Sequence, residues 1–195
     1  MIDYVTYLTV SIISCYHRRH DSGSSSSSMT SSYNYHHTTI ITQPSYTLFY
    51  YIGNAMIDKG FIKEAIHCYV TAIRLMPKFS AAHSNLGSVF KEQGKMQQAI
   101  AHYQEAIKID PSFADAYSNL GNAFKEVGQA EDAISCYNTA IKLDPNYAEA
   151  YANLAAVHKD SGKVMEAIEL YRKALGLKPD FGEAVANLTH SLVSE

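Results

Sequence analysis

The sequence predicts an all-α protein in which a pair of amphipathic helices repeats to form a solenoid, preceded by a low-complexity leader. Two observations predict this fold class. Apolar residues recur at three- and four-residue spacing within each helix, which is typical of a helix buried along one face. The same set of small residues, aromatic residues and helix breakers then returns every 34 residues. A single helix pair has too little apolar surface to fold alone, so the repeats must stack.

The clearest copy of the helix pair spans residues 111–145. Gly121 and Ala133 are small residues at points where the two helices must approach closely. Gly128 follows the first helix, where a residue with positive φ ends the last turn. Pro145 stops the second helix, because proline has no N–H donor and clashes with the preceding turn. The stretch therefore predicts a helix, a glycine turn and a second helix.

Several positions of this pair recur in phase over four periods. The small residue of the first helix is, in turn, Gly53, Gly87, Gly121 and Ala155. The turn glycine is Gly60, Gly94, Gly128 and Gly162, and the aromatic residue of the second helix is Tyr69, Tyr103, Tyr137 and Tyr171. This pattern resembles the tetratricopeptide repeat, a 34-residue helix-turn-helix. The resemblance predicts repeats at residues 46–79, 80–113, 114–147 and 148–181, with residues 182–195 beginning a fifth.

Residues 1–45 differ in composition from the repeats. The opening apolar run carries Asp3 where a signal peptide has positive charge, and it is shorter than the roughly 20 apolar residues that a membrane-spanning helix needs. The serine tract that follows is predicted to be disordered because it can bury almost nothing. The leader histidines have no cysteine or carboxylate partners on an ordered frame, so no metal site is predicted: His17, His20, His36 and His37. We assign this segment no function.

The net charge limits the kinds of partner that the sequence predicts, and the cysteine content indicates the compartment. The net charge of −3 and the pI near 6.3 give no electrostatic footprint for nucleic acid or an acidic membrane. The chain has three cysteines, an odd number without metal-ligand spacing, which favours a reducing compartment. Cys68 and Cys136 occupy the same repeat position two periods apart, so they cannot pair within one solenoid and are predicted to be inert thiols.

Asparagine recurs at the sixth position of repeats two to five, although it is a poor helix former. These residues, the asparagine row, are Asn85, Asn119, Asn153 and Asn187. One interpretation is structural, with each amide bonded to a neighbouring helix. The other is a ladder of amides in the concave groove, each able to donate and accept a hydrogen bond. At about 10 Å per repeat, the row matches every third residue of an extended chain rising about 3.3 Å per residue.

Four residues before each asparagine, on the same face, lie the residues of the acidic row: Ala81, Asp115, Glu149 and Glu183. Their acids either complement the positive end of the first helix or select partner residues with hydroxyl, amide or basic groups. Six residues after the asparagines come Lys91, Lys125 and Lys159, each followed by an acid, which is typical of a solvated edge with compensating charges. An amide and acid face argues against a lysine clamp for a partner's terminal carboxylate.

No catalytic constellation is found in the sequence. It has no glycine-rich phosphate loop, no HExxH motif and no strand-helix alternation that could build a nucleotide-sugar fold. His83, His102 and His158 occupy unrelated repeat positions, so helical spacing predicts no histidine cluster. We therefore expect no cofactor and no metal site in this chain.

The run AAHSNLGSVFKEQGKMQQAIAHYQEAIKIDPSFADAYSNLGNAFKE, with HKDSG at 158–162 and YRKALGLKPDF at 171–181, resembles the last repeats of the protein O-linked N-acetylglucosamine transferases. The resemblance covers residues 80–195. It implies a parent enzyme that transfers N-acetylglucosamine from a uridine-diphosphate donor to serine and threonine of nuclear and cytoplasmic proteins. Substrate-contacting aspartates of that family match Asp115 and, by conservative replacement, Glu149 and Glu183. The family's catalytic lobes have no counterpart here.

The resemblance implies a peptide-binding segment without activity of its own, located in the nucleus and cytoplasm. Its partners would be extended Ser/Thr-containing segments of substrate or adaptor proteins held along the asparagine row, and its uncapped solenoid ends could self-associate. The alternative is a stand-alone scaffold that binds one dedicated partner and has no role in glycosylation. An active enzyme would require a catalytic region that the given sequence does not contain.

Overall fold

The structure is a computed structural model that describes residues 45–193. In this range the regular secondary structure is entirely α-helical, which confirms the predicted fold class. The disorder expected for the leader, its histidines and its apolar run fall outside the described residues, except that Ser45 already begins the first described helix. The chain divides into two compact units at Leu75 and Met76, and each is described separately below.

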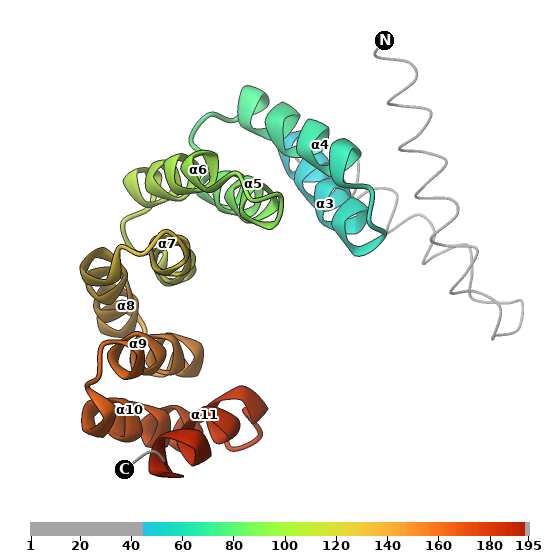
Figure 1. The fold of residues 1–195 in the computed structure, drawn as a ribbon. Helices are drawn as coiled ribbons and strands as arrows, with labels where there is room; N and C mark the ends of the chain where they lie inside the picture. The colour runs from blue at the N-terminus through green and yellow to red at the C-terminus, as the bar shows by residue number, and fades with distance from the viewer. Residues whose placement is uncertain (1–44, 194–195) are drawn as a thin grey trace, which may run out of the picture. The chain divides into compact units, whose positions relative to one another are not determined.

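The described part of the first unit is one helix pair, α3 (Ser45–Asp58) and α4 (Ile62–Leu75). The second unit holds three pairs and one further helix (Figure 1). The pairs are α5 (Ser80–Glu92) with α6 (Met96–Ile109), α7 (Ala114–Glu126) with α8 (Ala130–Leu143), and α9 (Ala148–Asp160) with α10 (Val164–Leu177). The last helix is α11 (Gly182–Val193).

Glycine and proline set the ends of these helices as predicted. Gly128 has a φ of 79° between α7 and α8, and the corresponding turn glycines of the other pairs also have positive φ. The N–H of Gln129 donates to the carbonyl of Phe124 at 2.9 Å, which satisfies one of the carbonyls left open at the end of α7. Helix α8 ends at Leu143, two residues before Pro145. The first and second helix of each pair are therefore joined by a short, defined turn.

A tyrosine of each second helix packs directly on the small residue of the first. Tyr103, Tyr137 and Tyr171 have no exposed surface. A Cβ atom added at Gly121 would lie 2.7 Å from Cε1 of Tyr137, closer than side-chain atoms approach one another, and Gly87 meets Tyr103 in the same way at 2.9 Å. Glycine is therefore required because the ring occupies the space that a side chain would fill.

The tyrosine hydroxyl has a partner on the residue that follows the small residue. Tyr137 donates to Oδ1 of Asn122 at 2.7 Å, Tyr103 donates to Oγ of Ser88 at 3.0 Å, and Tyr69 in the first unit donates to Oδ1 of Asn54 at 2.7 Å. These polar contacts satisfy hydroxyl groups that are otherwise excluded from water. In these three pairs they also fix the rotation of the second helix against the first helix.

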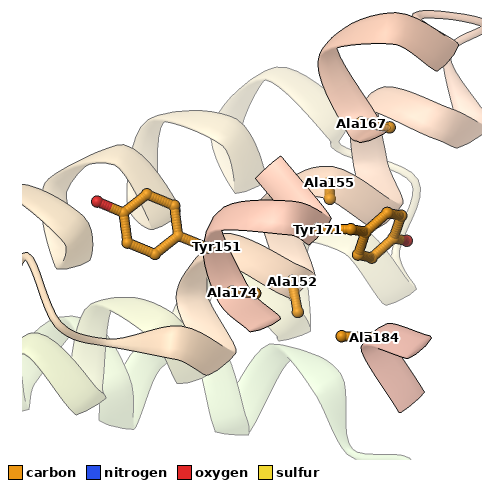
Figure 2. Close-up of a cluster of buried hydrophobic side chains, with 7 residues drawn as sticks. All are labelled: Tyr151, Ala152, Ala155, Ala167, Tyr171, Ala174 and Ala184. Carbon is orange, nitrogen blue, oxygen red and sulfur yellow. The ribbon is translucent and has the colours of Figure 1, made fainter. Parts of the chain in front are cut away.

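The pair formed by α9 and α10 lacks this hydrogen bond. Ala155 replaces the glycine, Ala156 stands where the other pairs have asparagine or serine, and the buried hydroxyl of Tyr171 has no partner in this structure. Figure 2 shows the ring of Tyr171 beside Ala155, in a cluster that also includes Ala184 of α11. An unsatisfied buried hydroxyl costs about 1–3 kcal/mol, so this pair lacks a stabilising contact that the other pairs have.

The helix pairs of the second unit stack through apolar residues. Ala99, Ile100 and Tyr103 of α6 form one cluster with residues of the next pair: Leu120, Ala123 and Cys136. In Figure 1 the first helices α5, α7, α9 and α11 follow one side of this unit and the second helices α6, α8 and α10 the other. Successive first helices are also in contact with one another. A residue that recurs at one position of the first helix is therefore repeated along one side of the unit.

Gly121→Ala tests the requirement for glycine. Overpacking against Tyr137 costs about 1–3 kcal/mol, and the better helix propensity of alanine returns roughly 1 kcal/mol. We expect a net loss of up to about 2 kcal/mol in the free energy of unfolding, measured by urea denaturation. Gly176→Ala in α10 is the matched control, because a Cβ there meets no atom within 4 Å; it should stabilise the chain by about 0.5–1 kcal/mol. Equal effects of the two substitutions would contradict the packing argument.

Ala156→Asn tests the missing hydrogen bond. The new amide oxygen would accept from the Tyr171 hydroxyl, as Asn122 does from Tyr137, and should raise the free energy of unfolding by about 1 kcal/mol. The same substitution combined with Tyr171→Phe provides the control, since the hydroxyl is then gone. A stabilisation that persists in the Tyr171→Phe background would show that the gain has another source.

Candidate functional site

The structure places the asparagine row on neighbouring helices. Each residue lies in the first helix of its repeat, on α5, α7, α9 and α11, and each side chain is half-buried: Asn85, Asn119, Asn153 and Asn187. Their exposure is intermediate, so each amide is partly covered and partly accessible. The row is therefore a continuous feature of the second unit, because successive first helices lie in contact.

A lysine of the preceding repeat reaches one member of the row. Nζ of Lys159 on α9 donates to Oδ1 of Asn187 on α11 at 3.1 Å. This contact fixes the orientation of the amide, because only the oxygen can accept from an ammonium group. The description of this face as amide and acid alone was therefore wrong, since lysine also lies at the row. Spacing along one helix could not show this, because the two residues belong to different repeats.

The acids of the acidic row contact residues that follow the second helix of their own repeat. Oε1 of Glu149 accepts from Nζ of Lys178 at 2.8 Å. That hydrogen bond, together with one from its own backbone N–H at the start of α9, lowers the pKa of Glu149. Burial, and next its hydrogen bond to Asp115, raise the pKa of Tyr147 to about 12. The carboxylates of Asp115 and Glu149 are thus already engaged, whereas Glu183 is exposed in the first turn of α11.

Two further residues of the predicted surface are Ala81 of the acidic row and Lys91, one of the lysines that follow the asparagines. Ala81 is half-buried and supplies no polar group to the acidic row. Lys91 on α5 pairs with Glu126 on α7, with Nζ 3.5 Å from Oε1. This ion pair joins neighbouring first helices across a partly exposed edge, where such pairs contribute about 0–1 kcal/mol. Both Lys91 and Lys159 therefore contact the next repeat.

The prediction that the repeat histidines form no cluster was wrong for two of the three. Nδ1 of His83 on α5 lies 3.3 Å from Nδ1 of His102 on α6, and the ring centroids are 5.5 Å apart. The pair is missed when each helix is considered alone. The pair could have been found from the contact of Gly87 with Tyr103. This contact sets the register of α5 and α6 and so brings their histidines together.

The two described cysteines are buried and free. Burial is the main cause that raises the pKa of each thiol to about 11, with smaller contributions from Glu64 near Cys68 and Asp132 near Cys136. At neutral pH both side chains are therefore protonated and act as small apolar groups. This agrees with the prediction of inert thiols.

Alkylation tests whether burial makes the two cysteines unreactive in the folded chain. A pKa of about 11 leaves about one thiol in a thousand ionised at pH 8, and burial further limits access. We expect iodoacetamide to modify Cys68 and Cys136 at least roughly tenfold more slowly in the folded chain than in urea, measured by peptide mass mapping. Rapid labelling of either cysteine in the folded chain would contradict its burial.

Within residues 45–193, no helix combines the length and apolar character needed to cross a membrane. In the same range, no group of three or more histidine, cysteine or acidic side chains is placed to hold a metal ion.

Comparison with known families decides the assignment of the fold. A family model described as TPR repeat matches residues 53–94, 87–128 and 121–162, and the tetratricopeptide repeat model matches residues 148–181. Together these matches cover well over half of the chain. The chain belongs to the tetratricopeptide-repeat family. Among curated proteins no match was found.

Several solved structures are similar to this chain. The MamA protein has a TM-score of 0.66 and 28% identity over 76% of this chain and 81% of its own. The first TPR domain of Spaghetti (RPAP3), bound to the HSP90 peptide SRMEEVD, has a TM-score of 0.57 and 26% identity over 59% of this chain and 91% of its own. YrrB, described as having an unusual peptide-binding site, has a TM-score of 0.63 and 23% identity over 72% and 73%, which shows the fold alone.

Proposed function

We propose that this tetratricopeptide-repeat protein binds extended segments of other proteins along the asparagine row of its second unit. The observation that carries the proposal is the placement of four half-buried amides on α5, α7, α9 and α11, which are first helices in contact with one another. Asparagine lowers helix stability, so a row of four requires a compensating role. A row of amides can bond the backbone of an extended chain at regular intervals without reading its sequence.

The contact between Lys159 and Asn187 refines the chemistry of this surface. Because the amide oxygen of Asn187 accepts from the ammonium group, its N–H groups are directed to other acceptors. The natural acceptor on an extended partner is a backbone carbonyl. At α11 the row therefore offers the partner mainly hydrogen-bond donors.

The finer identity of the partner rests on the resemblance to protein O-linked N-acetylglucosamine transferases. The asparagine row, Asp115, and the HKDSG and KPDF sequences support it. On this proposal the partners are Ser/Thr-containing segments of nuclear and cytoplasmic proteins. The sugar donor, a uridine-diphosphate sugar, would be used by the catalytic region of the full-length enzyme and not by the residues of this chain.

A dedicated scaffold for one acidic partner is the second candidate function. The lysine at the row favours it, and a similar tetratricopeptide-repeat domain was solved with the acidic peptide SRMEEVD bound. The two candidates differ in what the surface discriminates. A backbone-holding row binds many sequences with similar affinity, whereas a scaffold of this kind prefers acidic peptides strongly.

Peptide binding with substitutions in the row tests the proposal. Asn119→Ala combined with Asn153→Ala should weaken binding of unrelated extended Ser/Thr-rich peptides by roughly tenfold or more, because each lost backbone hydrogen bond contributes about 0.5–1.5 kcal/mol. Binding would be measured by fluorescence anisotropy, with the peptide SRMEEVD as the acidic comparison. The helical circular-dichroism signal should not change.

Asn138→Ala on α8 is the matched control, since this asparagine is exposed and lies on a second helix. It should leave binding unchanged. Loss of helicity in the double variant would support a structural role for the row. Strong preference for SRMEEVD, or binding of one sequence only, would favour the scaffold.

A further inference from the structure

The pair of His83 and His102 lies inside the first helix pair of the second unit. His83 is only 8% exposed, and His102 is half-buried. The corresponding residues of the other pairs in this unit are not histidines: they are Tyr117 with Cys136, and Tyr151 with Leu170. Two imidazoles in contact therefore occupy a place that the other pairs fill with phenol, thiol and aliphatic side chains.

The surroundings assign the protons of the neutral pair. Nε2 of His83 lies 3.4 Å from the carbonyl oxygen of Pro77, which can only accept, so this nitrogen carries the hydrogen. Nδ1 of His83 is then the acceptor of its ring. It receives the hydrogen bond from Nδ1–H of His102 across 3.3 Å. In the neutral state the pair links α5, α6 and the segment that precedes α5.

Protonation changes this arrangement in two steps. The first proton binds the free Nε2 of His102 and leaves the hydrogen between the two Nδ1 atoms in place, so the rings stay in contact. A second proton leaves two N–H groups of two cations facing each other, with no acceptor between them, at a largely buried site. The rings must then separate. The contact between α5 and α6 is then loosened at His83, the residue that holds the carbonyl of Pro77.

The neighbouring groups favour the neutral state. Burial first, and His83 second, lower the pKa of His102, while Glu105 on the same helix acts in the opposite direction. Glu105 is itself paired with Lys108, with Oε2 3.3 Å from Nζ. Phe90 of α5 stacks on His102, with the ring centroids 5.4 Å apart. Lys95, the residue before α6, lies over the ring of Phe90. Helix α7 packs on α6 through the apolar side chains of Leu120 and Ala123.

We propose that His83 and His102 form a proton-sensitive latch that closes the start of the second unit at neutral pH and releases it on acidification. Pro77, whose carbonyl His83 holds, lies at the start of this unit, next to the division at Leu75 and Met76. The sign follows from the lowered pKa of His102. At His102 the unfolded chain binds more protons, so the stability from its neutral ring is complete above the unfolded value near 6.5 and is lost as the pH falls through the lower folded value.

Unfolding of the full chain at pH 7.5 and pH 5.0 tests the latch. The control is His83→Tyr combined with His102→Leu, which are the residues that the chain itself uses at Tyr151 and Leu170. We expect acidification to raise the unfolding equilibrium constant roughly tenfold more in the native chain than in this variant, for each pKa unit by which His102 titrates below a free histidine. The leader histidines are common to both chains and cancel in the comparison.

An NMR titration of the imidazoles in the native chain makes the test independent of whether the double variant folds. The latch requires at least one of the two rings to titrate below the range of free histidine, and His83 to carry its hydrogen on Nε2 at neutral pH. Both rings titrating at about 6.5 or above would overturn the proposal. Equal acid sensitivity of the native and variant chains would overturn it as well.

Discussion

The contact between a small residue on the first helix and a fully buried tyrosine on the second is the constraint on which each helix pair depends. It brings two helices so close that a methyl group on Gly121 would overlap the ring of Tyr137. Close packing of this kind permits one register, because a shift of either helix would place a side chain against the ring. The hydrogen bond from the Tyr137 hydroxyl group to Asn122 then fixes the rotation of the second helix against the first. Every other feature of the repeat is positioned relative to this contact.

The same constraint separates the parts of the chain that hold the fold from those available to a partner. Asn122 and Asn119 lie three residues apart on α7, yet the first accepts from a buried tyrosine and the second belongs to the asparagine row. An asparagine in a first helix is therefore not by itself evidence of binding. Its place relative to the tyrosine distinguishes the structural amide from the one that a partner can reach.

Much of the fold could be predicted because its determinants are local or strictly periodic. Gly128 needs positive φ, Pro145 ends a helix, and Tyr137 returns every 34 residues, so turns, stops and core positions are visible in the sequence. The candidate site was predicted less completely. The asparagine row follows from periodicity, but the engagement of Glu149 by Lys178 depends on how a loop closes over its own repeat.

Contacts between helices explain what the sequence did not reveal. Lys159 and Asn187 are 28 residues apart, and they meet only because first helices of successive repeats lie side by side. His83 and His102 meet because the contact of Gly87 with Tyr103 fixes two helices in register. Neither pair follows from the spacing of residues along one helix. Both could be found once the packing of one pair is known and is applied to the other repeats.

We propose that the asparagine row, and not asparagine in general, contacts an extended partner. This is tested by the NMR shift of asparagine side-chain amides when an extended Ser/Thr-rich peptide is added to the full chain. We expect the amides of Asn119 and Asn153 to shift, while those of Asn122 and of the exposed Asn138 do not. Shifts confined to Asn122 or Asn138, or no shift of any row amide on binding, would contradict it.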